Sequence, residues 1–171
     1  MMLRTSRLWT IVSVAMLMTP SLSWGLESDS KKPIQIEADS ANMDDGEKRA
    51  TYRGNVILKQ GSMRLDADKV TIRQKISKNK GDALFADGRP AKFKQKVEGK
   101  PGTYVRGRGN RIEYYSKSAL LYLIGNASLT QDGDVFKSDR ITYNRNKSLI
   151  QGGAAAKGKK RVRITIKSKN D

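Results

Sequence analysis

Residues 53–72 read RGNVILKQGSMRLDADKVTI, and residues 124–143 read IGNASLTQDGDVFKSDRITY. The two stretches match without a gap at an offset of 71 residues, and apolar positions match as well as turn residues. The matching pairs are Gly54-Asn55 and Gly125-Asn126, Leu58 and Leu129, Gln60 and Gln131, Asp68 and Asp139, Val70 and Ile141, and Thr71 and Thr142. This self-similarity predicts an internally duplicated structure.

Apolar and polar residues alternate in both copies. Ile34 and Ile36 alternate with polar neighbours near the start of the match, and Val162, Ile164 and Ile166 do so near the end of the chain. A period of two residues predicts half-buried β-strands, and Asp-Gly dipeptides between the alternating runs predict tight turns. The sequence therefore predicts an all-β protein. The duplication favours an elongated β-jelly roll with unpaired strands at both ends.

The first 25 residues have the features of a secretory signal peptide. Arg4 and Arg7 precede the apolar run 8–18, and small residues follow it. The run is shorter than the about 20 residues that a membrane-spanning helix needs, which disfavours an uncleaved anchor or a buried first helix. We expect cleavage after Gly25, or alternatively after Ser23, and one exported domain over residues 26–171.

The chain is strongly basic, with 34 Lys and Arg against 17 Asp and Glu and a net charge of +17. Loss of residues 1–25 removes two arginines and no acid, which leaves +15. Such a field attracts polyanions. For an exported protein the candidates are an anionic lipid, an anionic glycan or a membrane surface.

The composition argues against an enzyme. The chain has no His and no Cys, and so lacks the commonest general base and a thiol nucleophile. It also lacks a nucleophile elbow, a P-loop and zinc-binding spacing. The acidic stretches 44–46 and 132–134 lack the spaced ligands of a calcium loop and are predicted to be hairpin turns. We predict no catalytic residue, no cofactor and no metal site. A glycan-active enzyme with paired carboxylates is a remote alternative.

Two basic segments resemble nucleic-acid-binding sequences. Residues 105–111 form an Arg-Gly segment, and residues 157–163 form a basic run. An exported protein does not meet nucleic acid, so we predict basic strand faces instead.

An ordered series of short motifs resembles the OstA family of periplasmic lipopolysaccharide-transport proteins, over residues 32–162. The order and spacing of these motifs are specific, although each motif alone is weak. The series consists of PIQIEAD at 33–39, GNV at 54–56, DADKV at 66–70, GRPAKF at 88–93, GNA at 125–127 and SDRITY at 138–143.

The resemblance implies a fold and a function. Members of the family fold as an elongated β-jelly roll of two facing antiparallel sheets and bind lipopolysaccharide between the sheets. They join head to tail and bridge an inner-membrane partner of the LptC type to an outer-membrane partner of the LptD type. By this resemblance the chain is a periplasmic lipopolysaccharide carrier.

The resemblance also implies which residues serve this function. The lipid-contacting candidates are Ile34, Ile36, Phe93, Ile112 and Tyr114. The candidate docking edges for other copies or partners lie in residues 33–39 and 160–168, with Ile34, Ile36, Val162, Ile164 and Ile166 as their apolar residues.

Two questions remain open at this point. The alternating apolar residues could form a closed structural core instead of a lipid slot. In that case the chain would be a basic periplasmic adaptor that binds an anionic glycan or the sheet of a partner. Arg161, Arg163 and Lys167 could protect a strand edge or contact phosphate, and the sequence does not favour either role.

Overall fold

The computed structural model describes residues 29, 31–78, 80–97, 100–145, 147, 149–153 and 161–168. The predicted signal peptide and Lys160 lie outside these residues. Within the described part of the chain, no helix is both long and apolar enough to cross a membrane.

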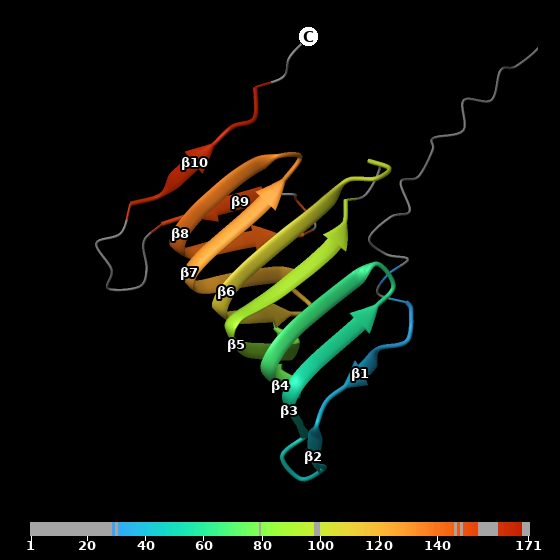
Figure 1. Cartoon of the computed structure of the whole chain (residues 1–171). Helices are drawn as coiled ribbons and strands as arrows, with labels where there is room; N and C mark the ends of the chain where they lie inside the picture. Colours follow the sequence, from blue (N-terminus) through green and yellow to red (C-terminus); the bar gives the residue numbers. More distant parts are fainter. Residues whose placement is uncertain are drawn as a thin grey trace, which may run out of the picture.

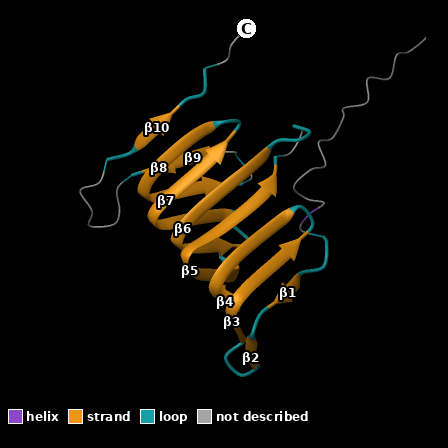
Figure 2. Cartoon of the chain, in the orientation of Figure 1, coloured by secondary structure: helices purple, strands orange, loops and turns teal. Residues whose placement is uncertain are grey.

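The described residues form a single antiparallel sheet, which confirms the all-β prediction (Figure 2). The strands follow one another in the order β1-β3-β4-β5-β6-β7-β8-β10, while β2 pairs with β3 and β9 pairs with β8. Their bounds are β1 Gln35–Glu37, β2 Ser40–Asp44, β3 Arg49–Gln60, β4 Met63–Ser77, β5 Gly81–Lys96, β6 Tyr104–Tyr115, β7 Leu120–Gln131, β8 Asp134–Asn144, β9 Leu149–Gly152 and β10 Arg163–Thr165.

The long strands bend near their middle, and the bends fold the sheet into two layers (Figure 1). The strand register shifts at each bend, as between Arg53 and Val56 in β3 and between Ile124 and Ala127 in β7. We call the layer that contains β2 and β9 layer A, and the layer that contains β1 and β10 layer B. The two predicted facing sheets are therefore two layers of one folded sheet.

The bends give the two layers a closed side and an open side. We call the line of bends the corner. The opposite side, where hairpins such as 60–63 of layer B and 115–120 of layer A end the two layers, is called the mouth. Among the described strands the backbone ladders run along the folded sheet, and none of them joins the two layers at the mouth.

The predicted duplication is visible in the backbone of the corner. The two copies of the Gly-Asn pair have nearly the same left-handed geometry, with φ of 77° and 45° at Gly54 and Asn55 and of 73° and 49° at Gly125 and Asn126. Their strands, β3 and β7, also begin and end at positions 71 residues apart. The Gly-Asn pairs thus mark equivalent bends.

Candidate functional site

A continuous apolar row lines the inner face of layer B. Its residues are direct cross-strand neighbours in eight strands, from the first edge of the layer to the last. In strand order the row consists of Ile36, Leu58, Leu65, Phe93, Gly107, Leu129, Phe136 and Ile164. Because alternate side chains of a strand point to the same face, the polar neighbours of these residues point outward.

Layer A presents two apolar rows to the same interior. The row nearer the corner contains Tyr52, Val70, Ala86, Ile112, Leu123 and Ile141, and the row nearer the mouth contains Ala50, Ile72, Leu84, Tyr114, Leu121, Tyr143 and Ile150. Most of these side chains join one hydrophobic cluster with those of layer B. The space between the layers, here called the slot, is therefore apolar along its length.

The structure brings four of the five predicted lipid-contacting residues into this slot. Phe93 and Ile112 are buried, with 3% and 0% of their surface exposed, and they lie in opposite layers. Ile36 and Tyr114 are half-buried and pack against the same cluster. Ile34 precedes β1 and is 54% exposed.

Gly107 has a role in the slot that the sequence did not indicate. A Cβ at Gly107 would collide with the ring of Phe93 and lie 2.9 Å from Cδ1 of Leu123. The missing side chain therefore leaves room for the Phe93 ring between the layers. The sequence showed Gly107 only as part of an Arg-Gly segment, because Phe93 and Leu123, which contact it in the fold, are far from it in the chain.

Each end of the sheet exposes two terminal strands (Figure 1). Among the described residues, β1 and β2 pair only with β3, and β9 and β10 pair only with β8. The predicted edge segments contain β1 and β10, whereas the sequence did not point to β2 or β9. Large apolar side chains are exposed at these ends, namely Ile34, Met43, Leu149, Val162, Ile164 and Ile166.

The outer face of layer B is basic. Five pairs of like charges stand opposite each other on neighbouring strands, which is unfavourable unless an acid or an anion lies near them. The pairs are Lys59 and Arg64, Arg64 and Lys94, Lys94 and Arg106, Lys92 and Arg108, and Lys137 and Arg163. Near the β1 edge the protein supplies acids: Lys59 has a partner in Glu37 at 3.3 Å, and Arg64 has one in Asp66 at 2.6 Å. The basic face is therefore uncompensated mainly in its middle and towards β10.

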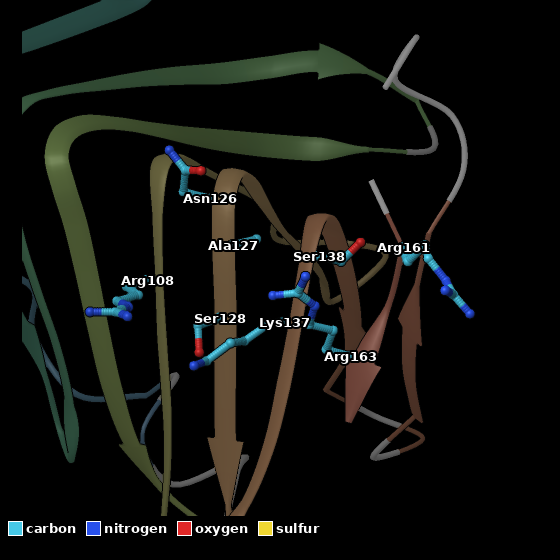
Figure 3. Close-up of a pocket in the computed structure, with 8 residues that line it drawn as sticks. All are labelled: Arg108, Asn126, Ala127, Ser128, Lys137, Ser138, Arg161 and Arg163. Carbon is cyan, nitrogen blue, oxygen red and sulfur yellow. The ribbon is translucent and has the colours of Figure 1, made fainter. Parts of the chain in front are cut away.

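A pocket of about 650 Å³ lies on this basic face. Figure 3 shows its lining residues spread over β6, β7, β8 and β10 and the segment before β10, where the side chain of Arg161 is turned away from the others. They are Arg108, Asn126, Ala127, Ser128, Lys137, Ser138, Arg161 and Arg163. The lining combines cations with hydroxyl and amide groups and contains no carboxylate, so the pocket suits an anion.

The outer face of layer A is compensated around β5 and β6, although towards β2 it also has two opposed pairs of like charges, Arg49 with Arg73 and Arg53 with Lys69. Arg111 donates hydrogen bonds to Glu113 at 2.8 Å and to Asp87 at 2.9 Å, and its guanidinium lies over the ring of Phe85. Burial alone would lower the pKa of Arg111, but these two carboxylates outweigh it and raise that pKa. Burial and the charge of Glu113 raise the pKa of Tyr115. Here the cation is held by the protein's own acids.

The acidic stretches 44–46 and 132–134 belong to tight hairpins. Asp44 accepts a hydrogen bond from the backbone N–H of Glu47 at 2.9 Å, within the turn between β2 and β3. Asp132 and Gly133 have φ of 53° and 93° and connect β7 to β8. In the described part of the chain no group of three or more acidic residues could hold a metal ion.

Comparisons with known proteins agree with this geometry. Residues 35–149 match the family described as LptA/(LptD N-terminal domain) LPS transport protein. The lipopolysaccharide export system protein LptH of Pseudomonas aeruginosa is 35% identical over 138 residues, which cover 79% of this chain and 76% of that protein. LptA of Escherichia coli K12 is 30% identical over 160 residues, which cover 92% of this chain and 84% of that protein.

The fold has a close counterpart among solved structures. The crystal structure of LptH, described as the LptA-homologous periplasmic component of the lipopolysaccharide transport device of Pseudomonas aeruginosa, superimposes with a TM-score of 0.74. The two chains are 31% identical in that superposition, which covers 82% of this chain and 99% of the other. The elongated jelly roll expected from the sequence is thereby confirmed.

Proposed function

Because the chain belongs to the LptA/LptD N-terminal family of lipopolysaccharide transport proteins, we propose that it carries lipopolysaccharide through the periplasm with the acyl chains between its two layers. The observation that carries this proposal is the apolar row of layer B, which runs without interruption from Ile36 in β1 to Ile164 in β10. An acyl chain gains about 0.8 kcal/mol for each buried CH₂ group.

The two layers would admit the lipid by separating at the mouth. Separation there breaks side-chain contacts but no described backbone ladder, and the bends at the corner act as the hinge. Acyl chains would replace the apolar contacts that the layers lose. In this proposal Ile36, Phe93, Ile112 and Tyr114 contact the acyl chains, and Ile34 contacts them at the β1 end.

The bridging function follows from the terminal strands. An edge strand presents unpaired N–H and C=O groups, to which another chain can add a strand. We place β9 and β10 of one copy against β1 and β2 of the next, so that the apolar row continues from Ile164 into Ile36 of the neighbour. The same ends would dock an LptC-like inner-membrane partner and an LptD-like outer-membrane partner.

Photo-crosslinking tests the lipid slot. A photoreactive residue at Phe93 lies inside the slot, and one at Thr142 lies on the outer face of layer A. We expect lipopolysaccharide adducts at Phe93 and none at Thr142. Adducts at neither position, together with protein adducts at the terminal strands, would contradict a lipid slot.

The basic outer face of layer B supports a second candidate function, binding of an anionic glycan by an adaptor without a lipid slot. Its support is the like-charged cross-strand pairs in the middle of this face and towards β10. A photoreactive residue at Lys92 reports on this face and one at Phe93 on the slot, one position apart in β5. Glycan adducts at Lys92 without lipid adducts at Phe93 would favour the adaptor.

A further inference from the structure

The mouth of the slot carries a polar cluster that contrasts with the apolar interior. Gln95 faces inward two residues after Phe93 and is only 3% exposed. Its side-chain N–H donates a hydrogen bond to the Asp29 carboxylate at 3.0 Å. Ser62 donates two more to the same carboxylate, one from its backbone N–H at 2.9 Å and one from its hydroxyl. Asp29 is therefore held at the rim of layer B, between β4 and β5.

Arg145 occupies the opposite rim, directly after β8 in layer A. Its backbone N–H donates to the carbonyl of Ala119 at 3.0 Å, and its guanidinium lies 5.1 Å from the ring centre of Tyr114. The Nε of Arg145 is buried and has no hydrogen-bond partner among the described residues. A buried N–H without an acceptor is unfavourable, so the Nε edge of this side chain is suited to receive an anion.

Asp29 and Arg145 interact electrostatically across the mouth. Burial alone would raise the pKa of Asp29, but the hydrogen bonds from Ser62 and Gln95 and the charge of Arg145 outweigh burial and lower that pKa. The carboxylate is thus ionised at neutral pH. Gln131, at the rim of layer B in β7, adds a buried amide oxygen that lacks a hydrogen-bond partner in the described structure.

We propose that Arg145 anchors the phosphate head of the lipid at the mouth, and that the Asp29 carboxylate on the opposite rim balances its charge when the slot is empty. The inference rests on the proposed function, because the anchor lies over Tyr114, where the acyl chains would begin. A phosphate carries more negative charge than a carboxylate and can accept two parallel hydrogen bonds from a guanidinium. It can therefore outcompete Asp29 for the charge of Arg145, while Gln95, Ser62 and Gln131 offer hydrogen bonds to the rest of the head.

The first test compares Arg145→Gln with Arg140→Gln. Arg140 is a matched control because it lies on the outer face of layer A, with its guanidinium 4.7 Å from the ring centre of Tyr122. The dissociation constants are measured with lipid A that bears both phosphates and with the same lipid A after removal of its phosphates. We expect Arg145→Gln to weaken binding of the phosphorylated lipid by about 10- to 100-fold, as expected for lost hydrogen bonds to a charged group.

The same variants should bind the dephosphorylated lipid like the wild type, and Arg140→Gln should bind both lipids normally. Circular dichroism melting confirms that each variant is folded. An equal loss of affinity for both lipids, or no loss for either, would overturn the anchor. If the wild-type protein binds neither lipid, the proposed function itself fails and the inference fails with it.

The second test concerns the competing carboxylate. Asp29→Asn should tighten binding of the phosphorylated lipid by about three- to tenfold, because no carboxylate then competes with the phosphate for the charge of Arg145. The control Asp68→Asn removes an acid near the corner that pairs with Arg89 at 3.6 Å, and it should leave the affinity unchanged. The gain should disappear when Asp29→Asn is combined with Arg145→Gln. Weaker binding by Asp29→Asn, or an equal gain in both backgrounds, would contradict competition for Arg145.

Discussion

The ring of Phe93 lies against Gly107, its direct cross-strand partner in β6, at the centre of the apolar row. A Cβ at Gly107 would collide with two carbons of that ring. The pair shows how the row keeps its width at this point: the ring of Phe93 stands in β5, and its neighbour in β6 has no side chain. An aromatic ring that covers a glycine on the next strand also replaces the packing that the glycine lacks.

Gly107→Ala should therefore destabilise the protein and impair the slot. We expect a loss of about 1–3 kcal/mol in the free energy of unfolding, as for overpacked cores, measured by urea denaturation. Lipid adducts at the slot should fall in the same variant, because the Phe93 ring must move. The control is Gly46→Ala, whose added Cβ would make only an ordinary contact of 3.5 Å with Asp44. Equal stability of the two variants would contradict the close packing of Phe93.

Alanine substitutions at the two equivalent bends should destabilise the protein to different extents. Both Gly54 and Gly125 have positive φ, so alanine at either position should cost about 1–2 kcal/mol in backbone strain. At Gly54 the new Cβ would also collide with Asp39, including its Cβ at 2.8 Å, whereas at Gly125 the closest atom is the side-chain nitrogen of Asn110 at 2.9 Å. Asn110 can move the end of its side chain, and Asp39 cannot move its Cβ without moving its backbone.

We therefore expect Gly54→Ala to lower the free energy of unfolding by about 1 kcal/mol more than Gly125→Ala. Urea denaturation of both variants measures the difference. Asp39 and Asn110 themselves occupy equivalent positions in the duplication. The reverse order of the two losses would contradict the tighter packing of Asp39 against Gly54.

Local sequence patterns predicted much of the fold. Alternation identified strands because one face of each layer is buried, and the gap-free offset identified Gly54-Asn55 and Gly125-Asn126 as equivalent positions. The pattern did not reveal that a single strand contributes to both layers. A bend that inserts extra residues keeps polar and apolar residues alternating on each side of it, so β3 and β7 look like uninterrupted strands.

Contacts between distant segments could not be predicted from the sequence. Asp29 and Arg145 come from opposite ends of the domain, and only the folded sheet brings them to the same mouth. Gly107 acquires its role from the ring of Phe93 and a side chain of β7. The strands β2 and β9 are short and mostly exposed, so their residues show little of the alternation that a buried face imposes.

Acid should weaken the contact that Asp29 makes with the rim. The pKa of Asp29 in the folded protein lies below its ordinary value of 3.8. A carboxyl group with a lowered pKa stabilises the fold above its unfolded pKa, and this stabilisation is lost as the pH falls through the folded pKa. Melting temperatures between about pH 6 and pH 2 should therefore fall less steeply below about pH 4 in Asp29→Asn than in the wild type.

Removal of the Ser62 hydroxyl offers an independent check of this pH effect. Ser62→Ala deletes one hydrogen bond that lowers the pKa of Asp29 while keeping the charge. The folded pKa of Asp29 should then lie closer to its unfolded value, so the loss of stability in acid should be smaller than in the wild type and should be complete at a higher pH. Identical acid profiles for the wild type, Ser62→Ala and Asp29→Asn would contradict a role of Asp29 in holding the rim.

The exposed end of the apolar row predicts how copies associate. Ile164 ends the row in β10 and is 55% exposed, so a charge at this position costs the single copy little. In a head-to-tail pair the same charge would be placed against the apolar residues around β1 of the next copy. We expect Ile164→Asp to raise the dissociation constant of self-association at least about tenfold, equivalent to about 1.4 kcal/mol. Small-angle scattering over a concentration series measures this change. Thr142→Asp, on the outer face of layer A, is the matched control. Its particles in solution should become longer as the concentration rises, as those of the wild type do. Unchanged lengthening in Ile164→Asp, or a wild-type protein that stays monomeric at concentrations where it binds lipopolysaccharide, would rule out association through the ends of the row.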